Sequence, residues 1–391
     1  MLLFALFLAA IDLAPEFAKD ETWTRSPANY SVYAKHGQFV WRDLRIWDLR
    51  MVPGGRGIER VEMSLYNRGD DQGAGMTMAE FKTLVAKIFP DLEISRVPKR
   101  KLKSGAFQYE YRDHKAVPPL ELAWGVNGGE VEYVRLTMVD AAAPKAPKAQ
   151  GQAAKAKVSA NVRRDADGDV WIANLPMVDQ GEKGYCAVAT CERVLRYYGS
   201  AVDEHELAQM AGTSAKEGTS VKAMKAVARE IGAKYRLGYN DIFAAADNVR
   251  ALEKEVDAYN KVAKAMKRPK IELERCYMGK TLMVPLVYEA MEAEVLLKMR
   301  TKDARFAKFM KDVKTRIDQG IPVCWSVRLG IFPEPDIPQA SGGHMRLIIG
   351  YNHETGELIY SDSWGRGHEK KRMDAGQAFA ITTSAFALKP L

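Results

Sequence analysis

The stretch Gln180-Gly181-Glu182-Lys183-Gly184-Tyr185-Cys186-Ala187-Val188-Ala189-Thr190 is typical of a loop that runs into a helix, with a cysteine at the junction. Backbone N–H groups and the positive end of the helix dipole favour a thiolate at such a position. Gln180 can bring its side-chain amide to the same place and stabilise an oxyanion. Because cysteines also begin helices for packing reasons alone, a nucleophile here requires a base elsewhere in the chain.

The residues after Cys186 predict helices first and strands later. Apolar residues at helical spacing predict a helix from Cys186 to Tyr198, which Gly199 ends. Further helices are expected over residues 203–211, 220–231, 241–266 and 285–318. After Gly320 the apolar period approaches two, which predicts strands over 321–327, 345–351 and 358–362. This order predicts an α+β fold in which the cysteine helix packs against an antiparallel sheet.

Two residues of these strands supply a base and a carboxylate. His344 follows Gly342-Gly343 at the head of one strand, and Asp362 ends the next strand of a predicted hairpin. These strand ends lie side by side in a hairpin, so the carboxylate can orient the imidazole. Each residue also has an ordinary alternative, since a lone histidine is usually structural and Asp-Ser-Trp-Gly is a common turn.

Residues 21–140 predict a separate, smaller α+β domain. Alternating patterns predict strands over 39–47, 60–66, 107–111 and 131–139, and a capping box at Thr77 and Glu80 predicts a helix that reaches Ile88. No catalytic set of residues occurs in this part. Substrate recruitment, autoinhibition, a pro-region and structural support all remain open for it.

Residues 141–164 form a predicted linker that carries much of the chain's excess positive charge. The net charge is +8, and residues 142–164 contain six basic residues and no acidic one. Residues 141–164 are rich in Ala, Lys and Pro and cannot bury a core, so the basic charge indicates a solvated linker rather than a nucleic-acid-binding face. The second domain is then expected over residues 165–391.

The N-terminal residues 1–20 begin with an apolar run over Leu2–Ile11 that is too short for a stable membrane span. The run has the length of a signal peptide, which predicts an exported, secreted or periplasmic protein. It lacks a preceding basic residue and a convincing cleavage site. The alternative is a buried first element of a cytoplasmic protein.

No metal or other cofactor is predicted. The four cysteines (Cys186, Cys191, Cys276 and Cys324) form neither a disulfide framework nor a zinc pair. The run Asp165-Ala-Asp-Gly-Asp169 has a superficial likeness to a calcium loop. Val170 and Pro176 stand where an EF-hand needs glycine and a carboxylate, so a turn is expected.

Three blocks of this sequence resemble the papain-like cysteine peptidase superfamily. Gln180-Gly181-x-x-Gly184-x-Cys186 is similar to its oxyanion and nucleophile motif, and His344 with Gly350-Tyr351 resembles its histidine strand. Asp362-Ser363-Trp364-Gly365 resembles its Asn-Ser-Trp-Gly block with Asp in place of Asn. Ala187 departs from the Trp of the lysosomal-type enzymes. The aspartate, with the helices after the cysteine, resembles the bacterial, bacteriocin-leader-processing (peptidase C39-like) branch. The resemblance covers roughly residues 170–391.

The resemblance implies a cysteine peptidase that hydrolyses peptide bonds through a thioester. Cys186 would attack, His344 would exchange the proton, Asp362 would orient the ring and Gln180 would hold the oxyanion. The expected partner is a peptide or protein substrate, with no nucleic acid, and the oligomeric state stays open. The alternatives are a transglutaminase-like acyl transferase on the same triad and a non-catalytic peptide-binding protein. The helical stretch 241–318 would be an insertion that lines or caps the cleft.

Overall fold

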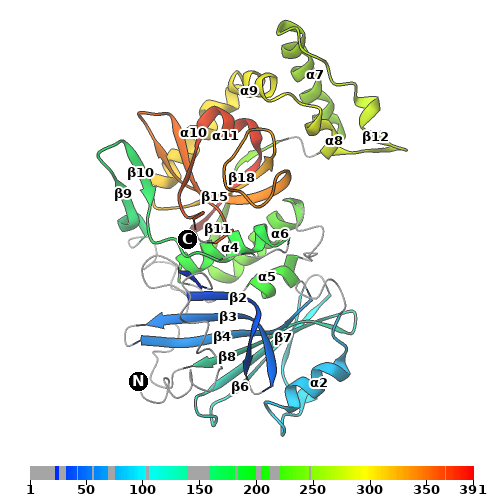
Figure 1. The fold of residues 1–391 in the computed structure, drawn as a ribbon, viewed down its shortest axis with the longest axis vertical. Coiled ribbons are helices and arrows are strands. Elements are labelled where there is room, and N and C mark those ends of the chain that lie inside the picture. The colour runs from blue at the N-terminus through cyan, green and yellow to red at the C-terminus, as the bar shows by residue number, and fades with distance from the viewer. Residues whose placement is uncertain are drawn as a thin grey trace. The chain divides into compact units, whose positions relative to one another are not determined.

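The computed structural model describes residues 23–25, 32–41, 43–54, 57–68, 75–102, 105–139, 158–178, 180, 184–199, 204–211, 221–245, 248–365 and 367–391. The chain forms two compact units (Figure 1). One comprises Met1–Gln150, Asn174–Glu230 and Ser363–Gly367, and the other comprises Gly151–Ala173, Ile231–Asp362 and His368–Leu391. This division differs from the expected one at residue 165, since residues 174–230 pack with the N-terminal part.

An eight-stranded antiparallel sheet of order β1-β2-β3-β4-β8-β7-β6-β5 dominates the first unit. Its strands are β1 (Trp23–Arg25), β2 (Val32–Trp41), β3 (Leu44–Gly54), β4 (Gly57–Asn67), β5 (Lys99–Lys101), β6 (Phe107–Asp113), β7 (Leu120–Asn127) and β8 (Glu130–Val139). The α+β class and the strands predicted around residues 60–66, 107–111 and 131–139 are confirmed. A short 3-10 helix, Ile94–Arg96, precedes β5.

Helix α2 (Met78–Ala86) covers part of this sheet and begins at the predicted capping box. The Thr77 hydroxyl accepts from the Glu80 N–H at 3.2 Å, and the Glu80 carboxylate accepts from the Thr77 N–H at 2.8 Å. Phe81 of this helix is fully buried, with its ring 5.1 Å from that of Trp124 on β7. Burial of each such aromatic side chain contributes about 2–3 kcal/mol.

The single strand predicted over residues 39–47 is wrong, because the chain turns back within it. β2 ends at Trp41, β3 begins at Leu44, and these two residues pair directly. Asp43 lies in the turn with φ of 60°, a left-handed conformation that Asp tolerates better than most residues. The alternation changes phase at the turn, from Phe39 and Trp41 to Leu44 and Ile46, so this change was the available signal for two strands.

The first unit also holds α4 (Cys186–Tyr197) and α5 (Glu204–Ala211), both close to their predicted bounds. Four buried side chains join α4 to the N-terminal sheet, and we name them the helix-side ion cluster: Arg50, Glu62, Glu192 and Arg196. Arg50 lies 2.8 Å from Glu192, and Arg196 lies 3.1 Å from Glu62. The N-terminal sheet is therefore bound to the helix that begins with the cysteine.

The second unit is built on an antiparallel sheet of order β11-β18-β14-β15-β10-β9, with β16 beside β15 and β17 beside β16. Its strands are β9 (Val162–Arg164), β10 (Asp169–Ile172), β11 (Leu237–Ala244), β14 (Val323–Leu329), β15 (Gly342–Asn352), β16 (Glu357–Ser361), β17 (Lys371–Asp374) and β18 (Thr382–Pro390). The hairpin of β15 and β16 confirms the pairing predicted from the sequence.

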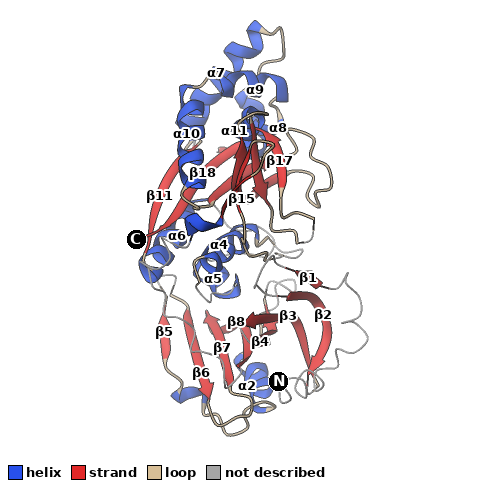
Figure 2. Cartoon of the chain, turned by 90° about the vertical axis from the view of Figure 1, so that its left-hand side faces the viewer, coloured by secondary structure: helices blue, strands red, loops and turns tan. Residues whose placement is uncertain are grey.

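Helices cover this sheet and continue into a helical part with a small hairpin. They are α7 (Val249–Ala265), α8 (Val284–Glu289), α9 (Ala293–Thr301), α10 (Ala304–Asp318) and α11 (Ala375–Ile381), with 3-10 turns at Ser159–Asn161 and Leu273–Cys276. The hairpin joins β12 (Tyr277–Met278) and β13 (Thr281–Leu282). Helix α10 lies along the sheet (Figure 2), whereas α7, α8 and α9 share a separate apolar core. The role of this part as a cap stays a prediction.

Several predicted helix bounds in the second unit are wrong. Residues 241–244 were predicted to be helical but belong to strand β11, because they pair with β18. The sequence analysis did not predict β18. Helix α6 (Val221–Tyr235) continues through Gly232, where a side chain would meet the Leu237 carbonyl at 2.5 Å. The helix predicted over 285–318 is divided into α8, α9 and α10, and the Asp303 carboxylate caps α10 by accepting from the Arg305 N–H at 2.8 Å.

Two predicted segments lie outside the described residues, one wholly and one in part. The N-terminal segment 1–20 lies wholly outside them, and of the linker, residues 141–157 do. Residues 159–164, which we assigned to the linker, form a 3-10 turn and β9, because β9 pairs with β10. None of the helices within the described ranges is both long and apolar enough to cross a bilayer.

Candidate active site

Cys186 is the first residue of α4, as predicted. Its side chain is half-buried, whereas Cys191, Cys276 and Cys324 are buried, and all four are free thiols. The preceding Tyr185 is the N-cap, and its hydroxyl donates to Asn67 Oδ1 at 3.3 Å. The positive end of the helix dipole therefore lies at the one cysteine that solvent reaches.

Ser363 makes hydrogen bonds with both the backbone and the side chain of Gln180. The Gln180 N–H donates to the Ser363 carbonyl at 2.8 Å, and the Ser363 hydroxyl donates to Gln180 Oε1 at 2.6 Å. Both residues are buried. Because Oε1 accepts this hydrogen bond, Nε2 is the end of the amide that can donate to an oxyanion.

His344 and Asp362 meet at the ends of β15 and β16. His344 is the third residue of β15, and Asp362 directly follows β16. His344 Nε2 contacts Asp362 Oδ1, and neither side chain is exposed to solvent. The Asp362 N–H also donates to the His368 carbonyl at 2.8 Å, which fixes the backbone beside the carboxylate.

A second cation shares the Asp362 carboxylate. Arg346 Nε lies 2.7 Å from Asp362 Oδ2, and Arg346 Nη1 donates to Glu334 Oε2 at 2.7 Å. We name His344, Asp362, Arg346 and Glu334 the histidine cluster. Sequence reasoning missed both Arg346 and Glu334. An arginine inside the apolar strand Met345-Arg346-Leu347-Ile348-Ile349 was the available signal, since a buried guanidinium needs anionic partners.

The predicted site residues fall in the two units as pairs. Gln180 and Cys186 belong to the first unit, and His344 and Asp362 belong to the second. The structure brings His344 and Asp362 together and holds Gln180 against Ser363. The approach of the Cys186 thiol to the His344 ring stays a prediction.

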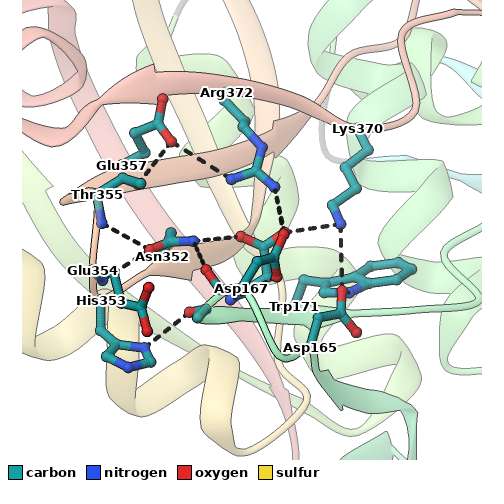
Figure 3. Close-up of polar contacts among 12 residues, drawn as sticks. Asp165, Asp167, Trp171, Asn352, His353, Glu354, Thr355, Glu357, Lys370 and Arg372 are labelled. Atoms are coloured by element: carbon teal, nitrogen blue, oxygen red, sulfur yellow. Dashed lines mark hydrogen bonds and ion pairs between the residues drawn. The ribbon is translucent and has the colours of Figure 1, made fainter.

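The acidic run at Asp165, Asp167 and Asp169 is a turn between β9 and β10, as predicted, in which Gly168 has φ of 86°. Its three carboxylates come within reach of one another. Figure 3 shows Lys370 and Arg372 directed at them, and the Lys370 ammonium lies 3.1 Å from Asp169. Burial would raise the pKa of Asp169, but hydrogen bonds from Asn352, Lys370 and Arg372 lower it. Lys370 and Arg372 therefore supply positive charge to this acidic turn.

Comparisons with known proteins match the region that contains the four predicted residues. Residues 174–252 match the peptidase C39 family, and residues 273–384 match the peptidase C39-like family. The similarity to the C39-like branch is thereby confirmed. A search of curated proteins gave no match.

Two solved structures show a weak similarity. The peptidase domain of Streptococcus ComA, a bi-functional ABC transporter involved in quorum sensing, is 13% identical, with 55% of this chain and 98% of that chain covered and a TM-score of 0.28. Xylellain, a cysteine protease from Xylella fastidiosa, is also 13% identical, with 60% and 88% covered and a TM-score of 0.25. Scores this low support no further conclusion.

Proposed function

Residues 174–384 contain a papain-like cysteine peptidase of the C39-like branch, and from this premise we propose that Cys186, His344 and Asp362 hydrolyse peptide bonds through a thioester. The buried pair of His344 and Asp362 carries the proposal. His344 Nε2 contacts the Asp362 carboxylate, so His344 Nδ1 is the ring nitrogen that exchanges a proton with the Cys186 thiol.

The proposed reaction has two steps. In the first, the Cys186 sulfur bonds to the peptide carbonyl carbon, the C–N bond breaks, and His344 gives its proton to the leaving amine. In the second, water attacks the thioester, His344 takes a proton from that water, and the C–S bond breaks to release the acid. Asp362 orients the ring and stabilises the imidazolium in both steps.

Gln180 is proposed as a donor to the oxyanion of both tetrahedral intermediates. Its support is the hydrogen bond from Ser363 to Oε1, which assigns the Nε2 amide group to the donor role. The backbone N–H of Cys186, at the start of α4, is the second proposed donor. Loss of one such donor typically lowers kcat on the order of a hundredfold or more.

The test uses the full chain and a peptide library made by digesting a bacterial lysate. We expect cleavage products by mass spectrometry, and we expect iodoacetamide to label Cys186 faster than the other cysteines. Cys186→Ala should abolish both signals. Cys191→Ala is the matched control, because Cys191 lies on the same helix and is buried.

Two results would contradict this proposal. Labelling that persists in Cys186→Ala and maps to Cys191, Cys276 or Cys324 would remove Cys186 from its role. Products that carry an added primary amine, with no hydrolysed peptide when that amine is present, would assign the same residues to acyl transfer instead.

A further inference from the structure

Arg346 is a buried cation on the same face of β15 as His344. The two residues are two positions apart, and alternate side chains of a strand point to the same side. The Arg346 side chain is completely buried, and its guanidinium lies 4.7 Å from the centre of the Tyr360 ring. A guanidinium in such a place is costly unless anions surround it.

The carboxylates of Asp362 and Glu334 both contact the Arg346 guanidinium, and each carboxylate also contacts a second residue. Asp362 turns one oxygen to Arg346 and the other to His344. Glu334 accepts from Arg346 and also from the Tyr360 hydroxyl, both at 2.7 Å. The ion pair with Arg346 therefore favours one rotation of the carboxylate that contacts the imidazole, and Glu334 holds the same guanidinium by a hydrogen bond.

The charges of the histidine cluster do not cancel without His344. Two carboxylates and one guanidinium sum to −1. Burial raises the pKa of Tyr360, and Glu334 and Asp362 raise it further against the opposing effect of Arg346, so its phenol stays neutral. If Glu334 were neutral, the sum would be zero, and an imidazolium at His344 would lose its net attraction.

Other charged groups near this cluster have different contacts. Lys371 on β17 donates to the Pro335 and Asp336 carbonyls at 3.0 and 3.3 Å. Arg328 on β14 donates to the Pro285 carbonyl at 3.2 Å and lies 3.6 Å from Glu289. His368 contacts Asp362 through its backbone carbonyl. Glu334 therefore adds a second carboxylate, besides Asp362, to the guanidinium of Arg346.

We propose that Arg346 and Glu334 are positioning residues for the peptidase reaction. Arg346 holds the Asp362 carboxylate in the rotation that His344 requires, and Glu334 cancels the charge of Arg346 so that the imidazolium remains stabilised. This inference rests on the proposed function of Cys186, His344 and Asp362. Neither residue touches substrate, and both act through Asp362.

The test is the pH dependence of kcat/KM for a library peptide that the wild-type chain cleaves. Glu334→Gln removes one negative charge, so the alkaline limb, where the imidazolium loses its proton, should move about one unit to lower pH. Tyr360→Phe removes a hydrogen bond to Glu334 without a change of charge, so its limb should stay at the wild-type pH. Glu357→Gln, which removes a charge at the far end of β16, is the matched control.

Arg346→Lys tests orientation separately from charge. Lysine keeps the positive charge but contacts one carboxylate at a time, because it lacks the planar fork of arginine. We expect an unchanged alkaline limb with kcat reduced about tenfold or more, and unfolding in urea should show that the variant is folded. Arg346→Lys with wild-type kcat would remove its positioning role.

The two levels of inference fail in different ways. A wild-type chain with no cleavage that depends on Cys186 would overturn the proposed function itself. A wild-type chain that cleaves, together with an alkaline limb in Glu334→Gln equal to that of Glu357→Gln, would overturn only the role of Glu334.

Discussion

The helix-side ion cluster and the histidine cluster are both buried and both contain two carboxylates, yet they differ in their cations. In the helix-side ion cluster, Arg50 and Arg196 each contact both Glu62 and Glu192, so each carboxylate lies between two guanidinium groups. In the histidine cluster, one guanidinium, that of Arg346, faces both Asp362 and Glu334. Within this cluster, the His344 ring contacts the Asp362 carboxylate and faces the surplus negative charge.

This difference separates a structural cluster from one suited to proton transfer. A buried carboxylate that lies between two guanidinium groups stays ionised over a wide pH range, because the cations favour its charged form. A set with one surplus carboxylate stabilises a positive charge that appears on a neighbouring ring during a reaction. Replacement of one carboxylate by an amide should therefore lower activity in the histidine cluster and unfolding free energy in the helix-side ion cluster.

Asp362→Asn should give the largest effect, a fall in kcat/KM on the order of 10²–10⁴. Arg346 would hold the amide oxygen, so the amide NH₂ would face His344 Nε2 and favour the tautomer with its proton on Nδ1. That tautomer cannot take a proton from the thiol. Steady-state kinetics on a cleaved library peptide measures the loss.

The same variant should unfold at nearly the wild-type urea concentration, because Arg346 and Glu334 remain as a balanced pair. An Asp362→Asn chain with wild-type kcat/KM would show that the surplus charge has no role in the reaction.

Glu192→Gln is the equivalent change in the helix-side ion cluster, and we expect it to cost about 3–5 kcal/mol of unfolding free energy. It leaves two buried arginines against Glu62 alone. Urea denaturation measures the loss. Glu206→Gln is the control, because its partner Arg100 is 43% exposed and such pairs contribute at most about 1 kcal/mol. Equal losses in both variants would contradict the structural role of the cluster.

The stability of the helix-side ion cluster should depend on pH through Glu62. Burial alone would raise the pKa of Glu62, but Arg196, Arg50, Arg60 and Arg135 lower it from 4.5 to about 2. A lowered pKa stabilises the fold fully above pH 4.5, and this contribution, about 3 kcal/mol, is lost as the pH falls towards 2. Urea unfolding across that range should show a steeper pH dependence in the wild type than in Glu62→Gln.

Asn67→Ala should give the smallest effect, about 1 kcal/mol of unfolding free energy. It removes the acceptor for the Tyr185 hydroxyl beside Cys186. A double-mutant cycle with Tyr185→Phe isolates this hydrogen bond from the other effects of each change. Additive losses in the cycle would mean that the contact contributes nothing to stability.

Local patterns were enough to predict much of this molecule. Helix α4, the capping box of α2 and the β15–β16 hairpin each depend on neighbours within a few residues. The hairpin alone was sufficient to place His344 beside Asp362, because pairing of its strands brings their ends together. The contact between His344 and Asp362 could therefore be predicted from the sequence.

Features that depend on distant partners were not predicted. Strand β11 is a strand because β18, about 140 residues away, pairs with it, and its own residues resemble a helix. Arg346 was visible as a misfit in an apolar strand, but Glu334 lies in a loop whose course no local pattern fixes. The attachment of residues 174–230 to the N-terminal sheet depends likewise on Arg50 and Asn67.

The contact between Arg50 and Glu192 has a consequence for proteolytic maturation. A cut between residues 140 and 157 would nick the chain without releasing the N-terminal fragment, because noncovalent contacts retain it on α4. The nicked protein should elute from a sizing column as one particle and separate into two fragments only in denaturant. Removal of this fragment would take away the buried partners of Glu192 and Tyr185, so we expect α4 to be less stable without it.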